Sequence, residues 1–181
     1  MAATIHEKGT AMTDAPTPLQ IAILTVSDSR DLAGDSSGAT LGELLEEAGH
    51  RLAERRLVPD DVYAIRAEAS RWIADPAVDC ILTTGGTGIT GRDGTPEAIA
   101  PLLDKEISGF GELFRYISYE EIGTSSLQSR ALSGVANGTF IFVLPGSRNA
   151  CRTAWTRIIE AQLDARTRPC NLTMLMPRLK E

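Results

Sequence analysis

The stretch Val78-Asp-Cys-Ile-Leu-Thr-Thr-Gly-Gly-Thr-Gly-Ile-Thr-Gly-Arg-Asp-Gly-Thr-Pro-Glu-Ala98 decides the fold. Its apolar run Val78–Thr84 predicts a buried strand, which is followed directly by a loop with three glycines, Gly85 to Gly88. A glycine-rich loop between a strand and a helix lets several backbone N–H groups converge on an anion, most often a phosphate. The alternative is an ordinary tight turn, which needs only one or two glycines.

The residues after this loop add charge to the predicted anion site. Thr95 is expected to cap a helix, with Pro96 as its first residue and Glu97 as an acid in its first turn. Arg92 and Asp93 lie between loop and helix, where a phosphate and a divalent cation would meet. This combination favours phosphoryl or nucleotidyl chemistry.

Apolar periodicity predicts alternating strands and helices over most of the chain. The predicted strands are 20–26, 51–58 and 78–84, and the predicted helices are 37–48, 61–74 and about 96–103. Further on we expect a helix at 110–122, strands at 131–136 and 139–144, and a helix at about 148–165. Asn137-Gly138 predicts a tight hairpin turn between the last two strands. This order indicates a three-layer α/β/α fold with a mostly parallel sheet and a small β-hairpin.

Length and composition predict one soluble domain, residues 20–181, after a polar tail, residues 1–19, that we expect to be disordered. No apolar stretch is long enough to cross a membrane. The net charge of −6 argues against a nucleic-acid partner. Three widely spaced cysteines, Cys80, Cys151 and Cys170, are expected to be reduced and buried in a cytoplasmic protein.

The histidines exclude several enzyme classes. His6 lies in the tail and His50 follows a helix stop. A Ser/His/Asp triad, a Cys–His pair or a histidine zinc site needs a histidine well placed in the core. The chemistry is therefore expected to use carboxylates, hydroxyls and backbone amides.

Two nucleotide-binding fingerprints match poorly. Gly86, Gly88 and Gly91 have the GxGxxG spacing, but the predicted helix starts too late and no strand-ending acid follows. A P-loop is excluded because no Gly-Lys-Ser/Thr follows the loop. A nicotinamide oxidoreductase therefore stays a distant alternative.

Polar residues follow several of the predicted strands, and together they predict one ligand-binding crevice. They are Ser27-Asp28, Asp60, the glycine loop and Pro145-Gly146-Ser147. In an open α/β sheet, ligands bind outside the carboxyl ends of the strands. Of the neighbouring acids Asp60 and Asp61, one is expected to cap a helix and Asp60 to face the crevice. The crevice suits a large polyanionic ligand.

These residues resemble the MoaB/MogA family of molybdenum cofactor biosynthesis, whose fold the gephyrin G domain shares. The resemblance covers about residues 20–173 and is closest to the MoaB type. It rests on the glycine loop, Arg92-Asp93-x-Thr95-Pro96-Glu97-Ala98, Ser129-Arg130-x-x-Ser133-Gly134 and Leu144-Pro145-Gly146-Ser147. Three longer stretches are similar to MoaB proteins: 109–112, 120–125 and 164–171. Ser147-Arg148 stands where MogA-type members have Asn-Pro or Gln-Pro.

The resemblance implies Mg²⁺-dependent transfer of AMP from ATP to the terminal phosphate of molybdopterin, with release of pyrophosphate. It also implies a homotrimer or a hexamer of two trimers. Asp93 and Asp60 match the acidic pair linked to catalysis and metal. The expected substrate-binding residues are Ser27, Asp28, Gly85, Gly86, Thr87, Gly88, Arg92, Thr95, Glu97, Ser129, Ser133, Pro145, Gly146 and Ser147. A non-catalytic molybdopterin-binding or scaffolding protein is the open alternative.

Overall fold

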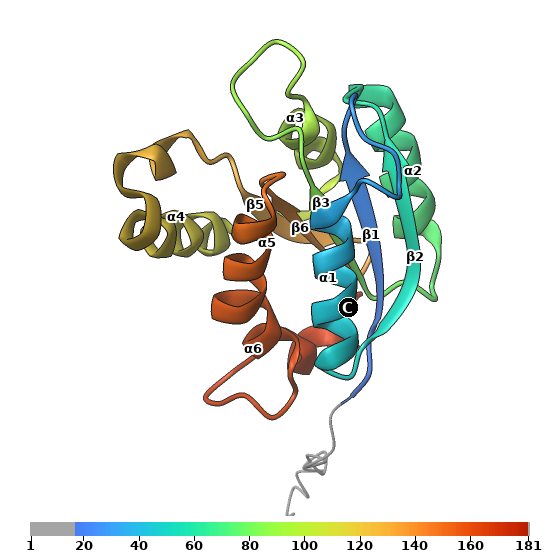
Figure 1. Ribbon diagram of the computed structural model, residues 1–181. Coiled ribbons are helices and arrows are strands. Elements are labelled where there is room, and N and C mark those ends of the chain that lie inside the picture. Colours follow the sequence, from blue (N-terminus) through green and yellow to red (C-terminus); the bar gives the residue numbers. More distant parts are fainter. Residues whose placement is uncertain (1–16, 181) are drawn as a thin grey trace, which may run out of the picture.

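A six-stranded sheet lies between two layers of helices in the computed structural model, which describes residues 17–180 (Figure 1). The spatial order of the strands is β2-β1-β3-β6-β5-β4. The strands are β1 (Gln20–Val26), β2 (Arg51–Val58), β3 (Cys80–Thr84), β4 (Lys105–Glu106), β5 (Leu132–Ala136) and β6 (Thr139–Leu144). Four of them run parallel, and β5 runs antiparallel to both β6 and β4. The predicted α/β class with a mostly parallel sheet is confirmed.

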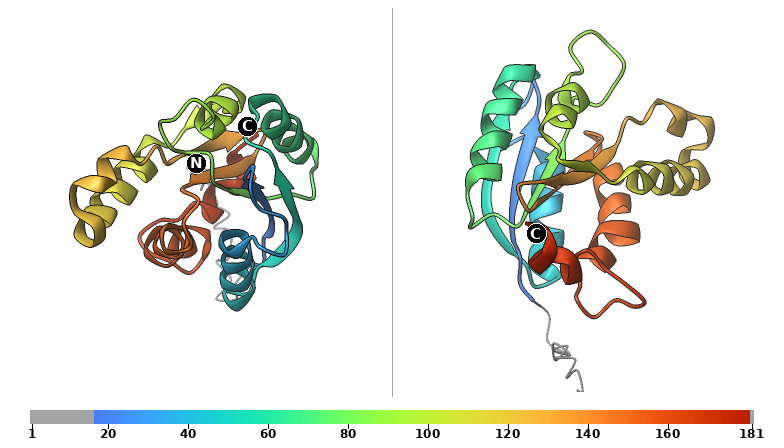
Figure 2. Two further views of the ribbon diagram at one scale, coloured as in Figure 1. Left: turned by 45° about the horizontal axis from the view of Figure 1, so that its top comes forward. Right: turned by 180° about the vertical axis from the view of Figure 1, so that it is seen from behind.

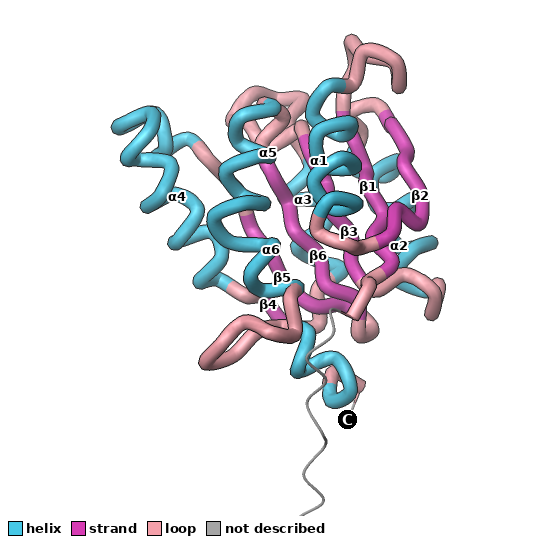
Figure 3. The backbone as a smooth tube through the Cα atoms, turned by 60° about the horizontal axis from the view of Figure 1, so that its bottom comes forward, coloured by secondary structure: helices cyan, strands magenta, loops and turns pink. Residues whose placement is uncertain are grey.

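Helices cover both faces of the sheet, as the views from other directions show (Figures 2 and 3). One face packs against α1 (Ser36–Glu47), α4 (Ser108–Ile122), α5 (Arg148–Ala154) and α6 (Glu160–Leu163). The other face packs against α2 (Val62–Ala74) and α3 (Thr95–Ile99). The short segments η1 (Ala100–Leu102), η2 (Gly123–Gln128) and η4 (Thr173–Arg178) are 3₁₀-helical, and η3 (Trp155–Ile159) is a π-helical turn.

The central strands are apolar because helices cover them on both sides. Every residue of β3 and of β6 is buried, which is typical of interior strands in such a sheet. The edge strand β2 instead carries charged residues, with Arg51 and Arg56 exposed. Charged side chains on an edge oppose unwanted pairing with another chain. The strand predicted from Val78 begins only at Cys80.

Local signals set most helix boundaries. The side chain of Asp35 accepts a hydrogen bond from Gly38 N at 2.9 Å and caps α1. Asp61 caps α2 in the same way, through Tyr63 N and Ala64 N. Just beyond α1, Gly49 has φ +87°, a conformation that stops a helix and that suits glycine. The prediction that one acid of the Asp60-Asp61 pair caps a helix is confirmed for Asp61.

The predicted hairpin is also confirmed. Asn137 (φ 47°) and Gly138 (φ 83°) form the turn between β5 and β6, whose strands pair antiparallel. Positive φ at both central residues is the geometry of a type I′ turn. The structure adds β4, an exposed edge strand of two residues, Lys105 and Glu106. Two charged residues carry no strand pattern, so this strand could not be predicted from the sequence.

Several predicted boundaries were wrong. The helix expected to run to about 103 ends at Ile99, and the chain continues as a 3₁₀ turn containing Pro101, which has no N–H to donate. The helix expected at 148–165 contains a π-helical turn and ends at Leu163. Leu19 was assigned to the tail, but it is buried and donates its N–H to His50 Nδ1 at 3.2 Å. Residues 1–16 of that predicted tail lie outside the described residues.

The cysteine prediction is correct for two of the three residues. Cys80 and Cys151 are buried free thiols, whereas Cys170 is exposed, because it follows the last helix in a surface segment. Between residues 17 and 180, no helix has the length and apolar character that crossing a membrane requires.

The order of the strands creates a topological switch point. The chain leaves β1 for β2 on one side and then crosses back to β3 on the other side of β1. The connections after β1 and β3 therefore diverge, which opens a crevice at the carboxyl ends of these strands. The loop from β3 to α3 rises above this end of the sheet (Figure 1).

Candidate functional site

A pocket of about 410 Å³ lies at this switch point; we call it the rim pocket. It is lined by the residues after three parallel strands, β1, β3 and β6. Its lining consists of Val26, Ser27, Ser29, Arg30, Gly85, Gly86, Thr87, Gly88, Asp93, Gly146 and Ser147. The structure thus brings together eight of the predicted site residues, seven from the predicted crevice and Asp93.

Two of the glycines allow the strand ends to approach one another. Gly85 has φ +102°, and a Cβ at this position would lie 2.2 Å from the carbonyl oxygen of Val26. A Cβ at Gly146 would lie 3.1 Å from the Cα of Gly85. No side chain fits at either position without moving the backbone. Packing alone accounts for these two glycines.

The other two glycines of the loop bring it against two carboxylates. A Cβ at Gly86 would lie 2.9 and 3.0 Å from the carboxylate oxygens of Asp60. A Cβ at Gly88 would lie 2.6 Å from one oxygen of Asp93. A tight turn does not require carboxylates at these places. The loop is therefore a cradle that side chains would fill, bordered by two acids from different elements.

The two acids have opposite pKa shifts. Burial raises the pKa of Asp60, and the nearby charges of Asp93 and Asp28 raise it further, against a hydrogen bond from Gly94 N. The pKa of Asp93 is lowered, mainly because the hydroxyl of Thr90 donates to it. Two carboxyl groups whose environments push their pKa values apart are typical of functional sites.

Thr95 has a different role from the one predicted. The N-cap of α3 is Gly94, which provides no side-chain cap. Thr95 is fully buried, its hydroxyl donates to Gly85 O at 2.9 Å, and its N–H donates to Gly86 O at 2.9 Å. It therefore attaches the start of α3 to the glycine loop, and the prediction of a Thr95 cap was wrong.

Asp28 and Arg92 lie beside the rim pocket and join its walls. Arg92 Nη2 lies 2.8 Å from one carboxylate oxygen of Asp28, and the other oxygen accepts the N–H of Asp60 at 3.0 Å. The ion pair is exposed, so it contributes little to stability. Its effect is local, since it ties the loop after β1 to the loops after β2 and β3.

The loop after β6 closes the pocket on the side of α5. Ser147 caps α5 by accepting a hydrogen bond from Ala150 N at 3.1 Å. Pro145 O accepts the hydroxyl of Thr84 at 3.0 Å, which fixes this loop to β3. Pro145 is thus a neighbour of the pocket, whereas Gly146 and Ser147 line it.

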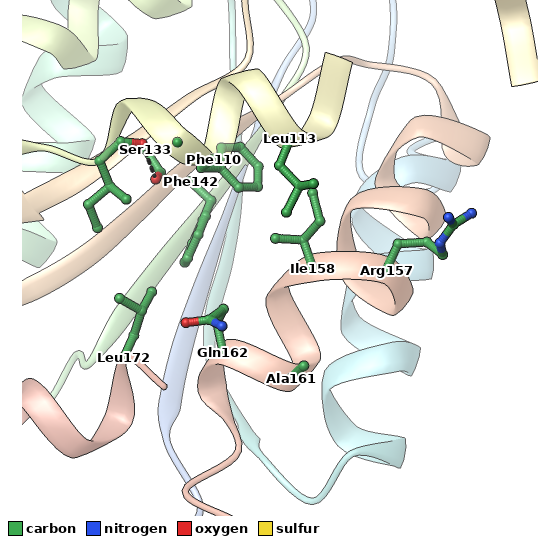
Figure 4. Close-up of a pocket in the computed structure, with 11 residues that line it drawn as sticks. Phe110, Leu113, Ser133, Phe142, Arg157, Ile158, Ala161, Gln162 and Leu172 are labelled. Carbon is green, nitrogen blue, oxygen red and sulfur yellow. Dashed lines mark hydrogen bonds between the residues drawn. The ribbon is translucent and has the colours of Figure 1, made fainter. Parts of the chain in front are cut away.

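Three predicted substrate-binding residues lie elsewhere. Ser133 lines a different cavity of about 280 Å³ between α4 and the last helices, where its hydroxyl donates to Ile107 O at 3.4 Å (Figure 4). Phe110 and Phe142 lie beside it there. The hydroxyl of Ser129 is buried with no partner among the described residues. Glu97 is exposed and forms an ion pair with an arginine.

Three residues that were not among the predicted site residues belong to this region, although Arg130 is part of the motif Ser129-Arg130-x-x-Ser133-Gly134. Ser29 and Arg30 line the rim pocket, and their position just after Ser27-Asp28 was the available signal. Arg130 donates Nη2 to Asp93 O at 2.9 Å and Nε to Thr87 O at 3.2 Å. Its spacing from the loop, more than 35 residues, gave no signal for this contact.

The geometry can be compared with known proteins. The family described as "Probable molybdopterin binding domain" matches residues 22–165. Molybdenum cofactor biosynthesis protein B of Escherichia coli (strain K12) is 56% identical over 164 residues, which cover 91% of this chain and 95% of that protein. The protein of the same name from Bacillus cereus is 45% identical over 164 residues, 90% of this chain and 94% of that one.

Solved structures agree with the sequence matches. A crystal structure of a molybdenum cofactor biosynthesis protein B has a TM-score of 0.80 at 47% identity, covering 82% of this chain and 93% of that chain. The tungsten cofactor synthesizing protein MoaB of Pyrococcus furiosus has a TM-score of 0.76 at 35% identity, covering 92% and 100%. The fold and these matches agree, and this chain belongs to the MoaB/MogA family of molybdenum cofactor biosynthesis proteins.

Proposed function

We propose that this protein transfers AMP from ATP to the terminal phosphate of molybdopterin in a Mg²⁺-dependent reaction. The products are adenylylated molybdopterin and pyrophosphate. The observation that carries the proposal is the pair of carboxylates, Asp60 and Asp93, against the glycine cradle of the rim pocket. Family membership supports a pterin substrate, and the carboxylates favour catalysis over binding alone.

The residues at the rim pocket fit Mg²⁺. This cation prefers oxygen ligands and is usually held by one or two carboxylates together with substrate phosphates. Asp60 and Asp93 would hold it, and it would neutralise charge on the triphosphate. Between residues 17 and 180, no group of three or more His, Cys, Asp or Glu side chains could hold a metal ion.

The reaction needs no histidine base. A phosphate monoester is largely dianionic at neutral pH, because its second pKa is about 6. An oxygen of the terminal phosphate of molybdopterin forms a bond to the α-phosphorus of ATP while the bond to the β-phosphate oxygen breaks. The chain has to align the two phosphates and offset their repulsion. Arg30 and the hydroxyls of Ser27, Ser29 and Ser147 stand at the pocket wall to do so.

The direct test is to incubate the purified protein with molybdopterin, ATP and MgCl₂. Adenylylated pterin is detected by mass, and pyrophosphate by a coupled assay. Asp93→Ala should lose at least 99% of the turnover (about 3 kcal/mol of barrier) while keeping its fold. Asp75→Asn is the matched control, since Asp75 also accepts a loop N–H, that of Ala77, but lies away from the rim pocket.

The outcomes separate the two function classes. Full turnover in Asp93→Ala would contradict the assigned role of this carboxylate. Binding of molybdopterin by the wild-type protein without release of pyrophosphate would favour the non-catalytic scaffolding alternative. Neither outcome is expected.

We also propose that the protein forms a homotrimer or a hexamer. Large apolar side chains are exposed on α4 and η2, and helix α4 projects from the body (Figure 1). They are Leu113, Tyr116, Tyr119, Ile122 and Leu127. Exposed apolar patches of this kind mark interaction surfaces. Sedimentation velocity should give a trimer or hexamer, and Tyr119→Glu should shift the population toward the monomer. A monomeric wild-type protein would contradict the proposal.

The proposal includes a cytoplasmic location, since ATP and Mg²⁺ are abundant there. The free thiols of Cys80, Cys151 and Cys170 agree with a reducing compartment. Fractionation of cells with an antibody against the chain would test it.

A further inference from the structure

Arg130 joins three parts of the site without lining the rim pocket. It precedes β5, far in sequence from the glycine loop. Its guanidinium donates to Thr87 O in that loop and to Asp93 O in the acidic loop, at 3.2 and 2.9 Å. The same group forms an ion pair with Glu97 of α3. One side chain thus connects the cradle, the catalytic acid's backbone and the first turn of α3.

The geometry requires an arginine. A guanidinium presents five N–H donors in a rigid planar fork, so it can reach two carbonyl oxygens and a carboxylate together. An ammonium group is a single point from which such separated acceptors cannot be spanned equally well. The backbone on both sides of Arg130 is itself held, because Arg115 of α4 donates to Ser129 O at 3.4 Å and Ala131 O at 3.3 Å. The backbone that carries Arg130 is therefore held in place by hydrogen bonds to α4.

We propose that Arg130 is the positioning residue that fixes the Asp93 loop against the glycine cradle. It acts through the backbone of Asp93 and Thr87 and leaves substrate contact to the residues of the rim pocket. The activity part of this inference rests on the proposed adenylyl transfer, whereas the part on loop order does not.

Two other roles are less consistent with the contacts. A direct role in binding phosphate is disfavoured because three of the five donors of Arg130 bond to two carbonyls and Glu97, and the residue does not line the rim pocket. A purely structural role in the core is disfavoured because the side chain is 29% exposed and its partners all belong to the loops and helix around the site. The remaining role is to hold these loops in register.

The experiment compares Arg130→Gln and Arg130→Lys with Arg66→Gln. Arg66 is a matched control because it also donates to backbone carbonyls of α3, Glu97 O at 2.8 Å and Ala98 O at 3.3 Å, but it does not reach either loop. Hydrogen–deuterium exchange by mass spectrometry is followed on peptides spanning 86–95, with a β6 peptide as internal reference. Melting temperatures and steady-state kinetics with ATP, Mg²⁺ and molybdopterin complete the set.

In Arg130→Gln, exchange over 86–95 should be about tenfold faster or more, since two hydrogen bonds from a charged donor are lost. The β6 peptide and the melting temperature should stay close to the wild type. We expect kcat to fall while KM for ATP changes little. Arg130→Lys should behave like Arg130→Gln, and Arg66→Gln like the wild type.

Unchanged exchange in Arg130→Gln, or full restoration by lysine, would overturn the inference, since the fork would then be unnecessary. A rise of KM with unchanged kcat would also overturn it, because it would indicate contact with the substrate. If the wild-type protein transfers no AMP, the proposed function fails, and the exchange data alone then decide the role of Arg130.

Discussion

Replacing Gly86 by alanine is the sharpest test of the cradle. Gly86 has φ +62°, and a Cβ there would lie 2.3 Å from Thr95 Oγ1 and 2.9 Å from a carboxylate oxygen of Asp60. Real Cβ atoms do not approach other atoms so closely, so Thr95 and Asp60 must move. Thr95 would then lose its hydrogen bond to Gly85 O.

The free energy of unfolding should fall by about 2–3 kcal/mol. A left-handed conformation costs a residue with a Cβ about 1–2 kcal/mol. Loss of the Thr95 hydrogen bond adds about 1 kcal/mol. For a domain of this size, each kcal/mol corresponds to about 2–4 °C in melting temperature, so the drop should be about 5–10 °C. Since Asp60 is displaced as well, the rate of the proposed adenylyl transfer should fall even at temperatures where the variant remains folded.

Gly91→Ala is the matched control in the same loop. A Cβ at Gly91 meets nothing within 4 Å, and its φ is not in the left-handed region. This variant should be as stable as the wild type or more so by up to about 1 kcal/mol, because alanine restricts the unfolded chain. Thermal and urea unfolding of both variants, alongside the transfer assay, give the comparison. Equal melting temperatures and activities for Gly86→Ala and Gly91→Ala would refute the steric reasoning.

Three further predictions concern titratable groups. Asp60 has a raised pKa in the fold, so its ionisation lowers the stability as the pH rises through that pKa. At pH 7 without Mg²⁺, Asp60→Asn should therefore have the same melting temperature as the wild type or a higher one. The same variant should abolish any increase in melting temperature that Mg²⁺ causes in the wild type. Burial opposes the ionisation of Asp35, but its hydrogen bonds and Arg55 lower its pKa on balance. The ionised carboxylate therefore contributes to the free energy of unfolding above pH 3.8, and this contribution is lost on acidification. Asp35→Ala should lower the free energy of unfolding by about 3–5 kcal/mol, measured by urea unfolding at pH 7. A thiol reagent at pH 8 should modify Cys170 alone in the native protein and all three cysteines after denaturation, since burial raises the pKa of Cys151 to about 11 and keeps Cys80 inaccessible.

Much of the fold could be predicted because its signals are local. The apolar runs of the parallel strands, the capping residue Asp61 and the Asn137-Gly138 turn each act within a few residues. The strand ends meet at one rim because parallel strands share a direction, so the crevice also followed from the sequence.

The features that the sequence did not predict depend on contacts between segments that are distant in the chain or on directions that a motif does not give. Strand β4 exists only because Lys105 and Glu106 pair with β5, and they have no strand pattern of their own. Thr95 looked like a cap, but its hydroxyl turns to the glycine loop ten residues earlier. Ser133 lies in β5, which runs antiparallel to β6, and it lines another cavity. The motif alone does not tell in which direction this strand runs or which cavity its residues line.

The charges around the cradle explain why a cation suits this site better than an acid–base pair does. Asp28 has Arg92 as its partner, and Asp93 has the hydroxyl of Thr90. Asp60 accepts the N–H of Gly94; burial and the charges of Asp93 and Asp28 raise its pKa, and the nearby charge of Arg92 offsets this only in part. Of the two acids at the cradle, ionised Asp60 is therefore less compensated than Asp93, whose pKa is lowered. A divalent cation would relieve this repulsion and at the same time attract a polyphosphate, whereas a proton on Asp60 would relieve the repulsion without adding a positive charge for the nucleotide.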